Sequence, residues 1–293
     1  MSVMLCAIVK NEAPYLVEWV AYHRMIGFDT IAVYENDSTD ETPDLLDRMR
    51  RIGVIDAHVP WRDVAGSPQL SAYRDAVRGC PSDWLMFLDA DEFLVLKTVR
   101  RVSDFIGFFP PDVACIGVNW RVFGSSGETD FAPRLVTERF RRAGLADSAV
   151  NFHVKSLFRP KQVDRVHMHA PALASGRAVL ANGAPLEMEP WGIATAVDWS
   201  AAQVNHYFCK SRAEYLLKRA RGCSSVGHDD PDKFSKYTDA HFDHHDLNDA
   251  RDDSMEPWLP DLGPVCADLR RRLGYPTPLK PRGMPVDVVR HEA

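Results

Sequence analysis

The chain carries the sequence WLMFLDADE at residues 84–92. Its five apolar residues, Trp84 to Leu88, are typical of a buried strand, and two carboxylates follow directly, Asp89 and Asp91. Carboxylates two residues apart at a strand end can share one hard divalent cation, which also binds substrate phosphates. The stretch therefore predicts a strand that ends in a metal-binding pair of aspartates. Solvated turn residues would give the same pattern.

Apolar strands alternate with amphipathic helices upstream of this stretch. Strands are predicted at residues 3–9, 30–34 and 54–59, and helices over residues 14–27, 42–53 and around 70–77. Such alternation predicts an α/β fold, with a mainly parallel central sheet and helices on both faces. Sheets of this kind bind ligands at the carboxyl ends of their strands. Three polar clusters fall at predicted strand ends: residues 10–12, 35–40 and 89–92.

The alternation weakens after residue 100. Further strands are predicted at residues 113–122, 156–159 and 165–169, an irregular segment over 171–200, and helices over 211–221 and around 265–273. We expect residues 1–100 and 101–255 to form two halves of one domain, the second with a smaller irregular region. Residues 256–293 would be a C-terminal helix and a loose tail.

Composition excludes several classes of protein. The 293 residues carry a formal net charge of −6, which disfavours sequence-independent binding to nucleic acid. The six cysteines form no CxxC pair, so free thiols in a reducing compartment are expected. No apolar stretch approaches the ~20 residues of a membrane span, and no secretory signal is recognisable. We expect a cytoplasmic protein without a membrane span. Peripheral contact with the inner face of the membrane stays open.

Several segments resemble glycosyltransferases. VYENDSTDET at residues 33–42 resembles the VDDGSTDGT segment of family 2 enzymes, and FLDADE at 87–92 resembles their FLDADD. VKNE at 9–12, WRVFGSSG at 120–127 and NHY at 205–207 are closer to a family 2-like branch with family 92 features. The resemblance implies a GT-A fold and transfer of a sugar from a nucleotide sugar, such as a UDP-sugar. The acceptor would be a hydroxyl of a glycan or lipid-linked molecule, and the anomeric centre would invert.

The resemblance also assigns residues to the nucleotide. Glu35 lies where the family's first Asp contacts the nucleoside, with an arm one methylene longer, and Arg74 would approach the base or the phosphates. Val9 and Asn11 would line the base pocket, and Asp89 would face the ribose and the metal. Residues 1–100 would then form the half that binds the nucleotide sugar, and residues 101–255 the half that binds the acceptor.

Metal and base complete the expected site. Asp91 would bind Mn²⁺ or Mg²⁺ directly together with Asp89, and His206 is the candidate third ligand, with a structural histidine as the alternative. An inverting transfer needs a general base for the acceptor hydroxyl. Five carboxylates qualify by their position after residue 91, and the sequence does not choose among them: Asp130, Glu138, Glu187, Glu189 and Asp198.

Two further histidine groups stand out. His167 and His169 would point to the same side of a predicted strand, and His241 would lie beside His244 and His245 on a helix. Either group could bind a metal ion, and either could be structural.

Three other functions fit parts of the pattern. An aspartyl phosphohydrolase also places DxD after an apolar strand, but it expects the motif on the first strand and a small residue where this chain has Phe93. A nucleotidyltransferase would need a glycine-containing phosphate loop after the first strand, whereas residues 10–14 contain no glycine. A non-catalytic sugar-binding protein could share the fold, but would not need both Asp89 and Asp91.

Overall fold

The computed structural model describes residues 1–62, 66–189, 192–223, 225–227 and 230–283. Its strands in chain order are β1 (Val3–Val9), β2 (Thr30–Glu35), β3 (Ala57–Pro60), β4 (Trp84–Phe87), β5 (Glu92–Leu96), β6 (Val113–Val122), β7 (Arg142–Ala143), β8 (Val154–Phe158), β9 (Val163–Arg165), β10 (Ala172–Leu173), β11 (Arg177–Leu180), β12 (Met188–Glu189), β13 (Ile193–Ala194), β14 (Ala202–His206) and β15 (Ala250–Arg251).

The α-helices are α1 (Ala13–Met25), α2 (Thr42–Arg51), α3 (Pro68–Gly79), α4 (Val102–Gly107), α5 (Val136–Arg139), α6 (Arg212–Arg221), α7 (Asp239–His245) and α8 (Leu259–Leu273). Short 3₁₀ turns lie at Ala149–Phe152, Pro160–Gln162 and Pro231–Lys233.

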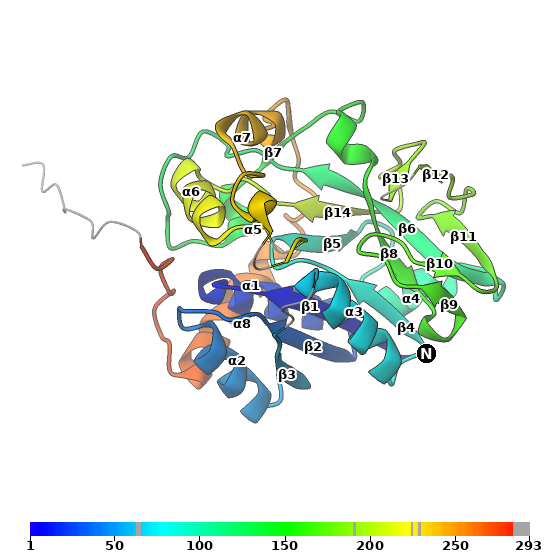
Figure 1. The fold of residues 1–293 in the computed structure, drawn as a ribbon, viewed down its shortest axis with the longest axis horizontal. Helices are drawn as coiled ribbons and strands as arrows, with labels where there is room; N and C mark the ends of the chain where they lie inside the picture. Colours follow the sequence, from blue (N-terminus) through cyan, green and yellow to red (C-terminus); the bar gives the residue numbers. More distant parts are fainter. Residues whose placement is uncertain (63–65, 190–191, 224, 228–229, 284–293) are drawn as a thin grey trace, which may run out of the picture.

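One nine-stranded sheet forms the centre of the molecule (Figure 1). Its strand order is β3-β2-β1-β4-β8-β6-β14-β5, and β11 pairs with β6 outside this path. Strands β3, β2, β1 and β4 run parallel, β8 runs antiparallel between β4 and β6, and β5 runs antiparallel to β14. The mainly parallel α/β sheet expected from the sequence is confirmed.

Alternate side chains of β1 belong to two separate cores. Val3, Leu5 and Ala7 pack in the larger core with residues of α1, α2, α4 and α8, while Met4 and Cys6 pack with residues of α3. This alternation follows from the period of two residues in a strand. Helices therefore cover both faces of the sheet, with α3 in front of it in Figure 1 and α8 against α1.

Several sequence expectations needed correction. The third strand begins at Ala57 rather than residue 54, and His167 and His169 follow β9 in irregular backbone, not on a strand. Segment 171–200 contributes β11 to the central sheet, so it is less irregular than expected. Strand β5 and helix α4 had no predicted counterpart. The division at residues 100 and 255 stays a prediction.

The topology gathers distant segments at one edge of the sheet. Strands β1, β4 and β14 end there. Because β8 and β5 run antiparallel to their neighbours, they begin at the same edge. Residues 9–12, 89–92, 153–155 and 206 consequently meet, although up to about two hundred residues separate them along the chain.

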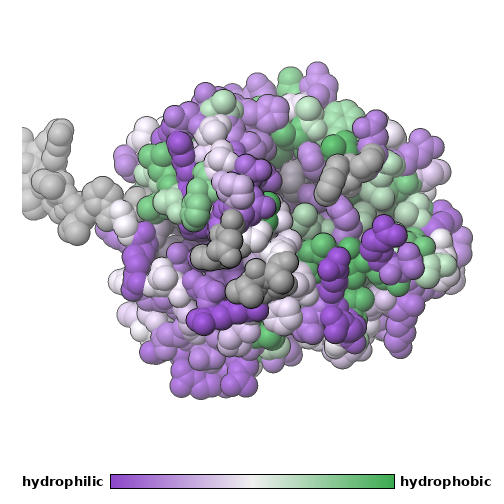
Figure 2. Space-filling model, viewed as in Figure 1, coloured by the Kyte–Doolittle hydropathy of each residue, from purple (hydrophilic) through white to green (hydrophobic). Residues whose placement is uncertain are grey.

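The described part of the chain offers no candidate membrane-spanning helix. Hydrophilic residues cover much of the face drawn in Figure 2. Within the described residues, the helices are all too short or too polar to traverse a bilayer. The six cysteines all lie in the described part of the chain and are free, as expected.

Candidate active site

A cavity of about 730 Å³ opens at the edge where these segments meet. Its wall includes Val9 at the end of β1, Asp89 and Asp91 after β4, and His206 at the end of β14. Helices α6 and α7 close the opposite side with Lys218, Arg221 and three histidines. This is the place where open parallel sheets bind ligands.

Asp91 is almost completely buried and is bound to a lysine. Its side chain is 6% exposed, and its Oδ2 accepts a hydrogen bond of 2.6 Å from Lys218 Nζ. Burial alone would raise the pKa of Asp91, but the nearby charges of Lys218 and Lys210 outweigh it and hold that pKa well below its ordinary value. Asp91 is therefore an anion whose charge Lys218 balances.

Asp89 lies in a more open position and has a different cation. Lys155 Nζ donates to Asp89 Oδ2 at 3.0 Å, and Gln69 Nε2 donates to the other oxygen at 2.8 Å. Lys155 also contacts Glu92 Oε2 at 3.2 Å. Burial would lower the pKa of Lys155, but Asp89 and Glu92 outweigh it and raise that pKa, so the buried lysine is charged.

His206 turns its ring toward Asp91 without a hydrogen bond to it. The distance from His206 Nε2 to Asp91 Oδ1 is 3.7 Å, too long for a hydrogen bond. Nδ1 is buried, with no hydrogen-bond partner among the described residues. Burial lowers the pKa of His206 well below 6.5, so the imidazole is neutral. Its orientation comes from ring packing, with the Trp120 centroid 4.3 Å away.

The donor types at this edge suit a divalent cation. Two carboxylates and a neutral imidazole, neither of whose nitrogens is hydrogen-bonded to another described residue, are ligands that Mn²⁺ accepts. They are not preassembled, because among the described residues no three such side chains surround a common point. Lys218 binds Asp91 and Lys155 binds Asp89, so a metal cation would compete with these lysines for the two aspartates.

The expected nucleotide residues lie at different distances from the cavity. Val9 and Asp89 form part of its wall. Asn11 and Glu35 do not. Asn11 Oδ1 accepts from Thr39 N at 2.7 Å, and Glu35 accepts from the backbone of Ser38, so both shape the turn after β2. Arg74 is exposed on α3 and is absent from the wall.

None of the five carboxylates considered as the base reaches the cavity wall. Four of them are exposed at the surface: Asp130, Glu138, Glu187 and Glu189. The fifth, Asp198, accepts a hydrogen bond of 2.6 Å from Ser200 Oγ. Among the described residues, three carboxylates line the cavity, Glu12, Asp89 and Asp91, and each is paired with a cation.

Two histidines of the wall have a nitrogen available instead. His153 Nδ1 lies 3.1 Å from the Val150 carbonyl, and His169 Nδ1 lies 3.0 Å from the Val154 carbonyl. A neutral ring that donates from Nδ1 leaves Nε2 as an acceptor. His153 stacks on Trp120 at 4.7 Å, and burial lowers its pKa below 6.5. Sequence reasoning missed His153, Lys155 and Gln69, because only the pairing of β4 with β8 and the packing of α3 bring them to Asp89.

The other histidine cluster also reaches the cavity. His241, His244 and His245 lie on α7, and the ring centroids of His241 and His245 are 4.3 Å apart. Burial lowers the pKa of His241 to about 4 and that of His245 to about 3. His241 and His245 pack as neutral rings against Phe208, and among the described residues the three histidines form no three-ligand metal group.

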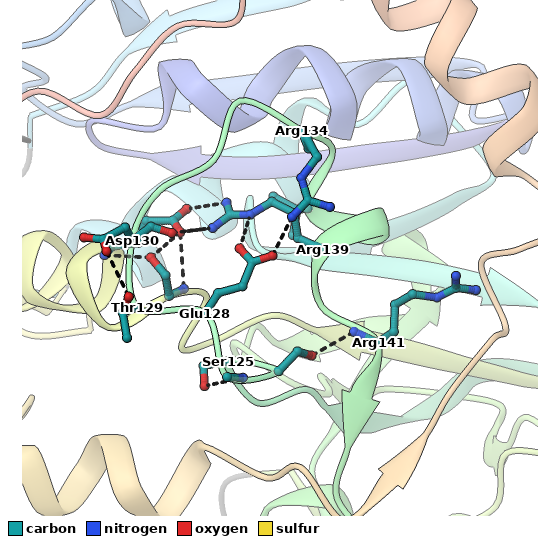
Figure 3. Close-up of polar contacts among 12 residues, drawn as sticks. Ser125, Glu128, Thr129, Asp130, Arg134, Arg139 and Arg141 are labelled. Carbon is teal, nitrogen blue, oxygen red and sulfur yellow. Dashed lines mark hydrogen bonds and ion pairs between the residues drawn. The ribbon is translucent and has the colours of Figure 1, made fainter. Parts of the chain in front are cut away.

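A buried ion network holds α6 in place. The Arg139 side chain is fully buried and binds Glu128 at 2.7 Å and Glu214 at 2.7 Å. Arg134 approaches the same Glu128 carboxylate (Figure 3). Glu214 completes a capping box with Ser211 at the start of α6. This network fixes the helix that carries Lys218 and Arg221 to the cavity.

Fold and cavity together define an α/β protein with a cavity at the carboxyl ends of its parallel strands, where proteins of this class bind ligands. Comparison of the sequence with known families assigns the protein to one family. The chain belongs to glycosyltransferase family 92, whose family profile, described as Glycosyltransferase family 92, matches residues 2–207. The GT-A-like class expected from the sequence is confirmed at the level of this α/β fold.

Individual relatives are distant. A family 92 protein of Oryza sativa subsp. japonica is 29% identical over 141 residues, which cover 46% of this chain and 24% of the rice protein. One from Ricinus communis is 29% identical over 128 residues, 42% of this chain and 23% of that protein. The matched part of the chain thus spans about a quarter of the length of these relatives.

Solved structures resemble the chain only loosely. S. aureus TarS residues 1–349 has a TM-score of 0.41 and 13% identity, covering 75% of this chain and 64% of TarS. Glucosyl-3-phosphoglycerate synthase from Mycobacterium tuberculosis, in complex with Mn²⁺, UDP and glucosyl-3-phosphoglycerate, has a TM-score of 0.34 and 14% identity, covering 64% and 72%. At such scores neither likeness supports a functional assignment.

Proposed function

We propose that the chain is a glycosyltransferase that moves a sugar from a nucleotide sugar, of the UDP-sugar class, to a hydroxyl of a glycan acceptor. One observation carries the proposal: in a member of family 92, the Asp89 and Asp91 carboxylates line a 730 Å³ cavity at the ligand-binding edge of the sheet. Each carboxylate is paired with a lysine, so the wall combines anions suited to a metal cation with cations suited to a diphosphate.

A divalent cation, Mn²⁺ or Mg²⁺, would be held by Asp89, Asp91 and His206. When bound, such a cation neutralises the negative charge of a leaving diphosphate. Lys218 and Arg221 line the same wall and would supply further positive charge to the phosphates. Val9 and Asp89 would contact the nucleoside, a role supported by their position in the wall at the ends of β1 and β4.

His153 is the residue we propose as general base. Its Nε2 is free to accept a proton once Nδ1 donates to the Val150 carbonyl, and no expected carboxylate base reaches the cavity. With His153 as the base, the acceptor hydroxyl would displace the diphosphate directly, in a single displacement with inversion.

The acceptor would lie against the aromatic part of the wall. Trp120, Phe208 and Tyr237 line the cavity with apolar faces, which suit the apolar faces of sugar rings. A glycan hydroxyl placed there would lie on the same wall as the His153 ring, which stacks on Trp120.

The test is donor turnover with a matched pair of variants. The purified chain is incubated with a panel of UDP-sugars and simple glycan acceptors, with Mn²⁺ or with EDTA, and released UDP is measured. Asp91→Asn should abolish Mn²⁺-dependent release, whereas exposed Asp130→Asn should retain it. Release of phosphate from simple monoesters instead would favour a phosphohydrolase. Equal turnover by Asp91→Asn would contradict the proposed site.

A further inference from the structure

A second, smaller cavity of about 220 Å³ lies beside the first one. One face of α6 forms its floor with Glu214, Leu217, Lys218 and Arg221, at helical spacing of three and four residues. Lys218 and Arg221 line both cavities, so the two are neighbours separated by these side chains. The proposed function uses only the larger cavity.

Positively charged side chains outnumber negatively charged ones in the described wall of the small cavity. Its wall contains four cations: Lys210, Lys218, Arg221 and Arg282. Three of these have carboxylate partners, at 2.6 Å for Lys218 with Asp91 and 3.8 Å for Arg282 with Glu41, while Arg221 pairs with Glu12. Lys210 differs from the others. In the described part of the chain, no carboxylate oxygen lies within 4.0 Å of its Nζ, and that atom makes no hydrogen bond.

Lys210 is nevertheless buried. The residue is 4% exposed, and its Nζ lies 4.3 Å from the centroid of the Tyr15 ring. Its backbone adopts φ +52°, and its side chain forms part of the wall of the small cavity. Asp91 and Glu214 act on Lys210 through their charge but form no ion pair with it, so an anion in the cavity would give the ammonium the direct contact that it lacks.

The two acidic residues of the wall do not supply this anion. Glu12 is bound by Arg221, and Glu214 is bound by buried Arg139 at 2.7 Å. Both carboxylates are therefore already neutralised by arginines. A ligand in the cavity would therefore supply the close negative partner that these carboxylates do not provide to Lys210.

We propose that the small cavity is a subsite for a phosphate group, recognised by Lys210 and distinct from the site of the nucleotide. A dianionic phosphate suits it because two guanidinium groups and two ammonium groups surround the space, and both groups bind phosphate oxygens through charge-assisted hydrogen bonds. The group could be free inorganic phosphate or a phosphomonoester on an acceptor. The proposal rests on the geometry of the small cavity and does not require the proposed transfer reaction.

The experiment measures phosphate binding to the full chain by calorimetry at constant ionic strength. The probes are inorganic phosphate and glycerol 3-phosphate, each added with and without saturating UDP. Lys210→Met keeps an apolar chain against Tyr15 and removes the charge. Lys236→Met is the matched control, because Lys236 is an exposed lysine that lines only the larger cavity.

We expect one phosphate per chain with UDP present, at least tenfold weaker binding by Lys210→Met, and unchanged binding by Lys236→Met. Tighter binding of glycerol 3-phosphate than of phosphate would identify a phosphorylated molecule as the source, and the reverse would identify free phosphate. Unchanged affinity in Lys210→Met, or full displacement of phosphate by UDP, would overturn the proposal. If Lys210→Met does not fold, acetylation of Lys210 in the wild type decides instead: protection by phosphate supports the subsite, and its absence refutes it. No outcome depends on turnover.

Discussion

Replacement of Lys218 by methionine should strengthen the binding of Mn²⁺ to the protein without nucleotide. Lys218 Nζ donates a 2.6 Å hydrogen bond to Asp91, and the two side chains are 12% and 6% exposed. A cation at Asp91 must break this contact. Hydrogen bonds to charged groups contribute about 1.5–3 kcal/mol, and each 1.4 kcal/mol changes an equilibrium constant about tenfold. Lys218→Met should therefore lower the Kd for Mn²⁺ about 10- to 100-fold.

The assay is a titration of Mn²⁺ in which the electron paramagnetic resonance signal of the free ion reports the unbound fraction. Arg219→Met is the matched control, since Arg219 lies on the same helix and pairs with Asp239 at the surface, at 3.3 Å. Its Kd should equal that of the wild type. An unchanged or higher Kd in Lys218→Met would refute the idea that this lysine occupies the place of the metal's charge.

Three further predictions follow from buried groups. Glu214→Ala leaves Arg139 buried with a lost partner and should lower the free energy of unfolding in urea by about 3–5 kcal/mol, whereas exposed Glu138→Ala should change it by less than about 0.5 kcal/mol; equal effects would contradict the network. Burial lowers the pKa of His23 to about 3 in the folded protein. Between pH 6.5 and pH 3 the unfolded chain therefore binds a proton at His23 and the folded chain does not, so the free energy of unfolding falls as the pH drops below 6.5. His23 should lower the free energy of unfolding by about 2 kcal/mol between pH 7 and pH 5, at about 1.36 kcal/mol per pKa unit. In urea titrations, His23→Gln should make the free energy of unfolding less dependent on pH; an unchanged pH dependence would contradict a neutral, buried His23. His153→Gln should lower kcat about 100-fold and remove the acidic limb of kcat/KM, which lies below pH 6.5 because burial lowers its pKa; a retained limb would assign the base elsewhere.

Local patterns were sufficient for the first half of the sheet. The strand predicted at residues 3–9 is β1 without change, and the apolar run before Asp89 is β4. Each of these runs is fully buried, so the hydrophobic pattern alone specifies it. The approach of His206 to Asp91 was also expected, and the 3.7 Å distance is compatible with it. Their role in metal binding remains our proposal.

The cations of the site could not be predicted in the same way. Lys155 reaches Asp89 because β8 pairs antiparallel with β4 in one register, Leu85 opposite Phe158. A shift of one residue would turn Lys155 to the other face of the sheet, and no local pattern determines that register. Lys218 reaches Asp91 because the Arg139 network fixes α6, which again depends on contacts between distant segments.

The two lysines explain how Asp89 and Asp91 can stay ionised at a largely buried edge of the sheet. Burial at 6% exposure would raise the pKa of Asp91, but the charges of Lys218 and Lys210 outweigh it and lower that pKa. In Lys218→Met the charge of Lys210 remains, and we expect it to keep Asp91 ionised. Because Asp91 is already ionised, it would hold a metal ion in place of the Lys218 ammonium without first losing a proton. The released ammonium stays on the cavity wall, where a diphosphate would need it. On this reasoning Lys218→Met should bind Mn²⁺ more tightly yet bind UDP more weakly, a pair of opposite changes that simple disruption of the site would not produce.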